Sequence, residues 1–88
     1  MGHKYFILLD EAERNELESM ADNLDLSGQR RRRASILLLA DIGPHGNGLS
    51  ASKISEQTGA TPRFVTHVLK RAMKNGPVKC AYGADRQG

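Results

Sequence analysis

The sequence has a single cysteine, Cys80, so it cannot form an intrachain disulfide bond. It has no tryptophan, and only two tyrosines and two phenylalanines. The longest apolar runs, Tyr5–Leu9 and Ile36–Ala40, are five residues long, whereas a membrane-spanning helix needs about 20. These absences exclude a disulfide-stabilised or membrane-spanning chain. They predict one small domain in a reducing compartment, the cytoplasm, with association to the nucleoid if the organism is bacterial.

No residue pattern typical of catalysis or of cofactor binding is present. The acids between Asp10 and Asp25 are expected on the outer face of a helix, where they cap it and keep it soluble. The three histidines and Cys80 lack the spacing of metal ligands, and no glycine-rich loop follows a strand. The sequence therefore predicts no enzyme, no metal or other cofactor, and no small-molecule substrate.

Charge is distributed unevenly, although the net charge is only +3. Residues 1–25 hold seven acids and two bases, a net charge of −5, and residues 26–88 hold eleven bases and three acids, a net charge of +8. No acid occurs between Glu56 and Asp85. This asymmetry favours a basic surface that faces a polyanion; a dipolar but inert surface is the alternative.

Hydrophobic periodicity, capping residues and helix breakers predict four helices, at about 10–24, 29–42, 51–58 and 62–75. In the first, Asp10 has the capping-box spacing to Glu13. The apolar stripe of this helix is expected to consist of Leu17, Met20, Ala21 and Leu24.

The second helix carries apolar residues around almost its whole circumference, from Ala34 through Ile42, which is typical of a helix packed on several sides. Gly43-Pro44 ends it and opens a glycine-rich loop over 43–48.

Residues 4–9 are expected to form a short strand or extended arm, which either packs on the helices or pairs with its copy in a homodimer through Tyr5–Leu9. Residues 77–88 show no periodicity and are predicted to be a flexible tail. A single domain over 1–76 follows.

The last two helices are separated by only three residues, Gly59-Ala60-Thr61, which predicts a helix-turn-helix. Ser50 and Thr61 are candidate N-caps, and Pro62 suits the first helical position. Gly59 suits the positive φ of a sharp turn. The expected fold is all-α, four helices with a homeodomain-like trihelical helix-turn-helix core.

The outer face of the helix over 62–75 is basic and carries no acid. A recognition helix uses its first residues on base edges and later ones on the backbone. The predicted base contacts are Thr61, Arg63, Thr66 and His67. The predicted phosphate contacts are Arg30, Arg31, Arg32, Arg33, Ser50, Lys53, Lys70, Arg71 and Lys74. Two alternatives stay open: His67 as a solvated residue, and Phe64 as either a core residue or a contact to a thymine methyl.

Four successive arginines at a helix N-terminus oppose the helix dipole and one another. A bound phosphate would make this cluster favourable, because it meets both the dipole and the guanidinium groups. At about 100° per residue the four side chains spread widely, so only two are expected to reach one DNA strand, Arg30 and Arg33. A solvated cluster whose stems cover apolar surface is the alternative.

The order of "LDEAERNELE", "RRRASILLLAD" and "LSASKISEQTGATPRFVTHVLKRAMKNG" resembles the N-terminal DNA-binding domain of insertion-sequence transposases in the mariner superfamily. The resemblance covers residues 4 to about 76. It implies that 30–40 is the first helix of a homeodomain-like unit and that 62–75 inserts into terminal-repeat DNA. The loop over 43–48 is longer than is usual in that family, and Val68 stands where many members carry an aromatic residue.

The acidic catalytic domain of such transposases has no counterpart in these 88 residues. The resemblance therefore implies a transposase-type DNA-binding domain or a stand-alone regulator of transcription, with double-stranded DNA as partner. The alternative function is a helical protein-interaction module that acts through the acidic first helix or the N-terminal strand.

Overall fold

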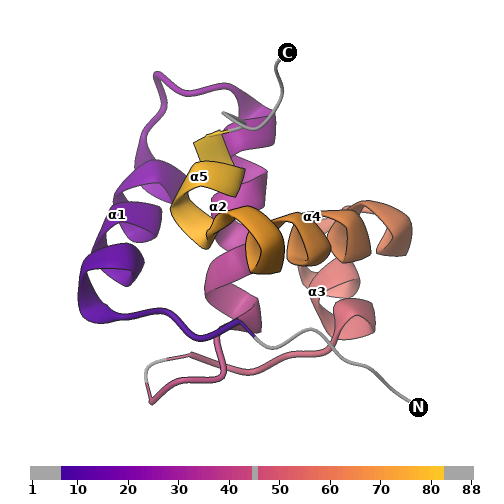
Figure 1. Cartoon of the computed structure of the whole chain (residues 1–88). Coiled ribbons are helices and arrows are strands. Elements are labelled where there is room, and N and C mark those ends of the chain that lie inside the picture. The colour runs from indigo at the N-terminus through magenta and orange to yellow at the C-terminus, as the bar shows by residue number, and fades with distance from the viewer. Residues whose placement is uncertain (1–6, 45, 83–88) are drawn as a thin grey trace.

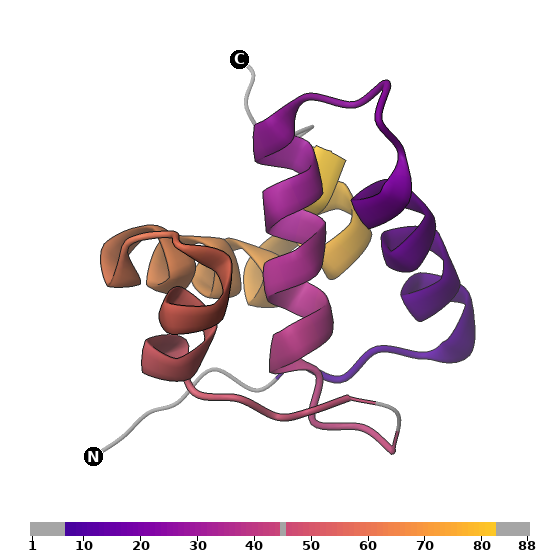
Figure 2. The same ribbon diagram turned by 180° about the vertical axis from the view of Figure 1, so that it is seen from behind.

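The computed structural model describes residues 7–44 and 46–82, which form five helices, four of them around a central one. The helices are α1 (Glu11–Asp22), α2 (Gly28–Ala40), α3 (Ala51–Thr58), α4 (Pro62–Asn75) and α5 (Pro77–Tyr82). The central helix, α2, contacts each of the other four. Figures 1 and 2 show α1 on one side of α2 and the α3–α4 pair on the other, with α5 between α1 and α4. The predicted all-α class is confirmed.

Capping side chains determine where the first four helices begin. Asp10 accepts a hydrogen bond from the Glu13 amide, and the Glu13 side chain accepts one from the Asp10 amide, which completes the predicted capping box. Ser50 and Thr61 are the caps of α3 and α4, as predicted. The cap of α2 is Ser27, so this helix begins one residue before its predicted start.

α1 ends at Asp22, two residues earlier than predicted. The Asn23 side chain accepts a hydrogen bond from the Asp25 amide, and the Asn23 backbone carbonyl accepts one from Leu26. This local turn competes with the helix for the same backbone groups. As a result Leu24 is 81% exposed and does not belong to the apolar stripe, whereas Leu26 packs against the core.

α2 ends at Ala40, also two residues before its predicted end. Asp41 leaves the helix in an extended conformation and forms a parallel bridge with Ile7. Ile42 is 51% exposed as a consequence, so the prediction that the buried surface of this helix extends to Ile42 is wrong.

The segment after Gly76 is helical as far as Tyr82, which corrects the first part of the flexible tail predicted over 77–88. Gly76 has a φ of +100°, and Pro77 occupies the first position of α5, where the missing amide hydrogen costs nothing. Cys80 and Ala81 are buried between α5 and its neighbours α4, α2 and α1. Residues 83–88 lie outside the part of the chain that the structure describes.

The N-terminal segment packs on its own chain from Ile7 onward. Ile7 and Leu9 are buried and Leu8 is exposed. The carbonyl of Ile7 accepts a hydrogen bond from the Ile42 amide at 2.8 Å. Residues 4–6 of the predicted strand lie outside the described residues, and the homodimer through Tyr5–Leu9 stays a prediction.

The core is built mainly from small and branched aliphatic side chains. α1 contributes Leu17 and Met20 to this core, α2 contributes Ile36 and Leu37, and α3 contributes Ile54. The buried residues of α4 are Val65, Val68, Leu69 and Ala72.

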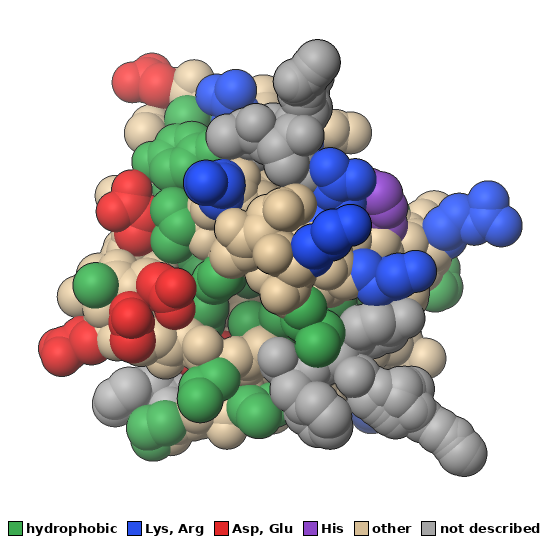
Figure 3. Space-filling model, in the orientation of Figure 1, with side chains coloured by type: hydrophobic (Ala, Val, Ile, Leu, Met, Phe, Trp, Pro, Cys, Tyr) green, Lys and Arg blue, Asp and Glu red, His purple; other side chains and the backbone are tan. Residues whose placement is uncertain are grey.

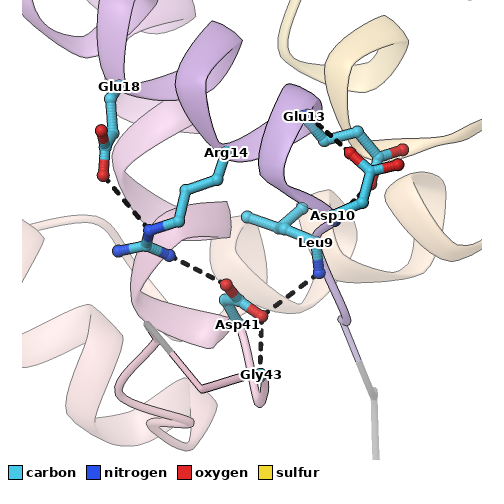
Figure 4. A network of polar contacts seen from close by, with 7 residues as sticks. All are labelled: Leu9, Asp10, Glu13, Arg14, Glu18, Asp41 and Gly43. Atoms are coloured by element: carbon cyan, nitrogen blue, oxygen red, sulfur yellow. Dashed lines mark hydrogen bonds and ion pairs between the residues drawn. The ribbon is translucent and has the colours of Figure 1, made fainter.

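A buried carboxylate joins the N-terminal segment, α1 and the end of α2 (Figure 4). Asp41 is 1% exposed and accepts hydrogen bonds from the amides of Leu9 and Gly43. It also forms an ion pair with Arg14, whose Nη1 lies 2.8 Å from its Oδ2. Arg14 pairs in turn with exposed Glu18. These contacts hold three segments together at the end of α2 that lies away from the arginine cluster.

Candidate nucleic-acid interface

The turn between α3 and α4 is fixed by its own hydrogen bonds. Gly59 ends α3 with a φ of +77°, as its sequence position predicts. The Ser55 hydroxyl donates to the carbonyl of Ala60, and the Thr58 hydroxyl donates to the carbonyl of Ile54. Thr58 also accepts a hydrogen bond from the Ala60 amide at 3.3 Å. The two helices are therefore joined by a short, internally bonded connection.

The outer face of α4 is basic along its length. Its exposed cations are Arg63, Lys70 and Lys74, with exposed His67 and half-buried Thr66 between them. We call these five residues the basic face of α4. Its first part forms a shallow depression lined by Pro62, Arg63, Thr66, His67 and Lys70.

The four arginines at the start of α2 point to two different places. Arg30 and Arg33 line a concave region together with His67 and Arg71 of α4. Arg31 and Arg32 line a separate one, where Gln57 and Thr58 of α3 also lie. The structure thus brings together the two arginines that the sequence analysis favoured and places the other two away from α4.

The first of these concave regions, which we call the basic hollow, has a volume of about 510 Å³. It lies between the start of α2, the middle of α4 and the end of α5. Its lining residues are Ser27, Gln29, Arg30, Arg33, Phe64, His67, Val68, Arg71, Cys80 and Tyr82. The sequence analysis did not predict that Cys80 and Tyr82 contribute to this site, because it did not predict α5. Pro77 follows the turn at Gly76 and begins α5, and proline is common at the first position of a helix.

Phe64 is half-buried and packs against the hydrophobic core while lining the basic hollow. This location is in line with its interpretation as a core residue. The other predicted contacts lie at the margins of this surface. Ser50 and Thr61 use their hydroxyl oxygens as helix caps, at 3.4 Å from the Lys53 amide and 3.2 Å from the Phe64 amide. Lys53 and Lys74 are exposed and line neither the basic hollow nor the depression on α4.

The two signs of charge are separated in space as well as in sequence. Figure 3 shows acidic side chains on the side of the molecule that carries α1 and basic side chains on the side that carries α4. At the border, the Tyr82 hydroxyl donates a hydrogen bond to Glu16 at 3.0 Å. This hydrogen bond raises the pKa of Tyr82 above its ordinary value of 10.0, desolvation and the Glu16 charge add to the rise, and nearby Arg30 opposes it.

The described residues contain no cluster of histidine, cysteine, aspartate and glutamate that would hold a metal ion. Within the same part of the chain, every helix is too short or too polar to cross a membrane. Comparisons with family models, curated proteins and solved structures gave no match.

Proposed function

We propose that this chain is a DNA-binding helix-turn-helix protein whose recognition helix is α4. The observation that carries the proposal is the basic face of α4, directly after a three-residue turn from α3. Solvated helices usually mix charges of both signs for pairing between neighbouring turns. A face with cations in every turn and no acid is better explained by contact with phosphates.

The arrangement of α2, α3 and α4 supports a homeodomain-like docking mode. These three helices contact one another in all three pairs, so α4 is held against a two-helix support with its basic face outward. In this mode the first residues of α4 enter the major groove. Arg63 is the main candidate for reading a guanine, because its guanidinium can donate to O6 and N7 together.

The start of α2 supplies the second part of the proposed interface. Arg30 and Arg33 lie on the same side as Arg71 of α4, where a DNA backbone beside the groove would pass. Phosphate contacts position a protein on the duplex, whereas base contacts give specificity. The proposal agrees with the resemblance to transposase DNA-binding domains, in which the helix corresponding to α4 inserts into DNA.

The experiment that tests this function compares two single-charge variants, Arg63→Gln and Lys79→Gln. Lys79 is exposed on α5 and lines neither the depression on α4 nor the basic hollow, so it controls for loss of one positive charge. Affinity is measured by fluorescence anisotropy on a duplex selected from a random pool and on an unselected duplex.

We expect Arg63→Gln to weaken binding to the selected duplex by about 5- to 150-fold, the usual value of a bidentate base contact of about 1–3 kcal/mol. Binding to the unselected duplex changes much less, and Lys79→Gln changes neither. Absence of binding to any duplex at low salt contradicts the proposal, as does an equal effect of the two variants.

A further inference from the structure

The basic hollow is distinct from the outward basic face of α4, because most of its lining comes from other elements. Arg30 and Arg33 come from the first two turns of α2, and Tyr82 from the last turn of α5. Its inner lining includes Val68 and Cys80, which are 1% and 4% exposed. The floor of the hollow is therefore partly apolar, and its rim is basic.

The charged side chains that line this hollow are all basic. Three arginines, Arg30, Arg33 and Arg71, line it together with His67, and none of the described lining residues is acidic. The first turn of α2, capped by Ser27, forms one wall. Its backbone amides add partial positive charge on the same side. Arginine side chains and backbone amides therefore both favour an anion at this site.

Arg33 adds an independent sign that the hollow can hold an acceptor. Its Nη1 atom is buried and has no hydrogen-bond partner among the described residues. Its Nη2 atom has only a long hydrogen bond of 3.5 Å, to Oε1 of Gln29. A buried guanidinium nitrogen without a partner is costly, and an oxyanion in the hollow would supply the acceptor.

We propose that the basic hollow is a binding site for a phosphate group. A phosphate offers several charged oxygens to adjacent guanidinium groups, and such contacts are often bidentate. The group is either a phosphate of the DNA backbone or a free phosphate or phosphate ester. Only the DNA source rests on the proposed function, because the anion chemistry of the hollow is independent of the basic face of α4.

Thermal unfolding in inorganic phosphate, compared with chloride at the same ionic strength, tests the site itself. We expect phosphate at about five times its dissociation constant to raise Tm by about 4–8 °C relative to chloride. The rise is expected in the wild-type chain and in Lys79→Gln, but not in Arg33→Gln. If Arg33→Gln does not fold, Arg30→Gln takes its place, since Arg30 is exposed and its loss leaves no gap in the core.

Duplex binding at several salt concentrations identifies the source of the phosphate. If a DNA phosphate occupies the hollow, Arg33→Gln makes the slope of log affinity against log salt shallower by about 0.9. If the phosphate-specific rise in Tm is present but the slope is unchanged, the occupant is a free phosphate or phosphate ester.

The proposal is overturned if phosphate and chloride give the same Tm for the wild-type chain and Arg33→Gln leaves the slope unchanged. Its failure is distinct from that of the proposed function. A phosphate-specific rise in Tm without duplex binding leaves the hollow as a phosphate site and removes the DNA-binding role. Normal duplex binding, with no phosphate-specific rise in Tm and no effect of Arg33→Gln on the slope, removes the hollow as a phosphate site and leaves the DNA-binding role.

Discussion

At the scale of single residues, the most consequential contact is the ion pair of Asp41 with Arg14. Asp41 is the one charged residue among those described that is fully buried, and it has three donors around it. Removing one partner of a buried ion pair leaves the other uncompensated, which costs more than the pair itself contributes. The residue is thus a determinant of stability, although it lies away from the proposed interface.

We predict that Asp41→Ala lowers the free energy of unfolding by about 3–5 kcal/mol, because it removes the buried acceptor of the Arg14 Nη1 and of two backbone amides. Urea denaturation of the purified variant measures this loss. The matched control is Glu18→Ala, which removes the exposed partner of the same arginine and is expected to cost at most about 1 kcal/mol. Equal effects of the two variants would show that the buried network contributes nothing beyond a surface pair.

A second prediction at this scale concerns the hydrogen bond from Tyr82 to Glu16. Because this contact raises the pKa of Tyr82 in the folded chain above its ordinary 10.0, the protonated phenol stabilises the fold below pH 10. This contribution is lost as pH rises through the folded pKa. In a Tyr5→Phe background, tyrosinate absorbance reports Tyr82 alone, and Glu16→Gln is expected to move its titration midpoint down toward 10. Glu18→Gln, two residues further along α1, is expected to leave the midpoint unchanged. If both variants act alike, the hydrogen bond is not the cause.

At the scale of elements, the sequence was most informative where one residue type has one local role. Asp10, Ser50, Thr61 and Gly59 have strong preferences for caps or for positive φ, and they are found in those roles. The ends of α1 and α2 were predicted two residues too far along the chain. The turn at Asn23 and the bridge from Asp41 to Ile7 compete with the helix there, and hydrophobic periodicity does not detect such competition. α5 was missed because six residues are too few to show a period.

The turn between α3 and α4 gives a prediction at this scale. An alanine Cβ at position 59 would lie in open space, but the backbone there has a φ of +77°. An alanine Cβ at position 28 would also lie in open space, and the backbone there, in the first turn of α2, has an ordinary φ. We expect Gly59→Ala to lower the free energy of unfolding by about 1–2 kcal/mol. Gly28→Ala should be neutral or stabilise by up to about 1 kcal/mol. Thermal or urea denaturation of both variants measures these changes in stability. Equal effects would contradict a requirement for left-handed backbone at Gly59.

At the scale of the whole molecule, the main feature is the separation of charge around a central helix. The sequence predicted an acidic first part and a basic remainder, and Figure 3 shows acidic side chains on the side that carries α1 and basic ones on the side that carries α4. What it did not predict is the basic hollow, because that depends on how α2, α4 and α5 pack. Arg30 and Arg33 line the same hollow as Arg71, which lies about forty positions further along the chain, and no local pattern encodes this placement.

The central proposal is that the basic side of this molecule binds the phosphate backbone of duplex DNA. The most direct test is the affinity of the full chain for an unselected duplex, measured across a range of salt concentrations. With four to six phosphates neutralised by the α2 and α4 cations, we predict a slope of log affinity against log salt of about −4 to −5. No binding at low salt, or binding whose affinity is independent of salt, would contradict the account.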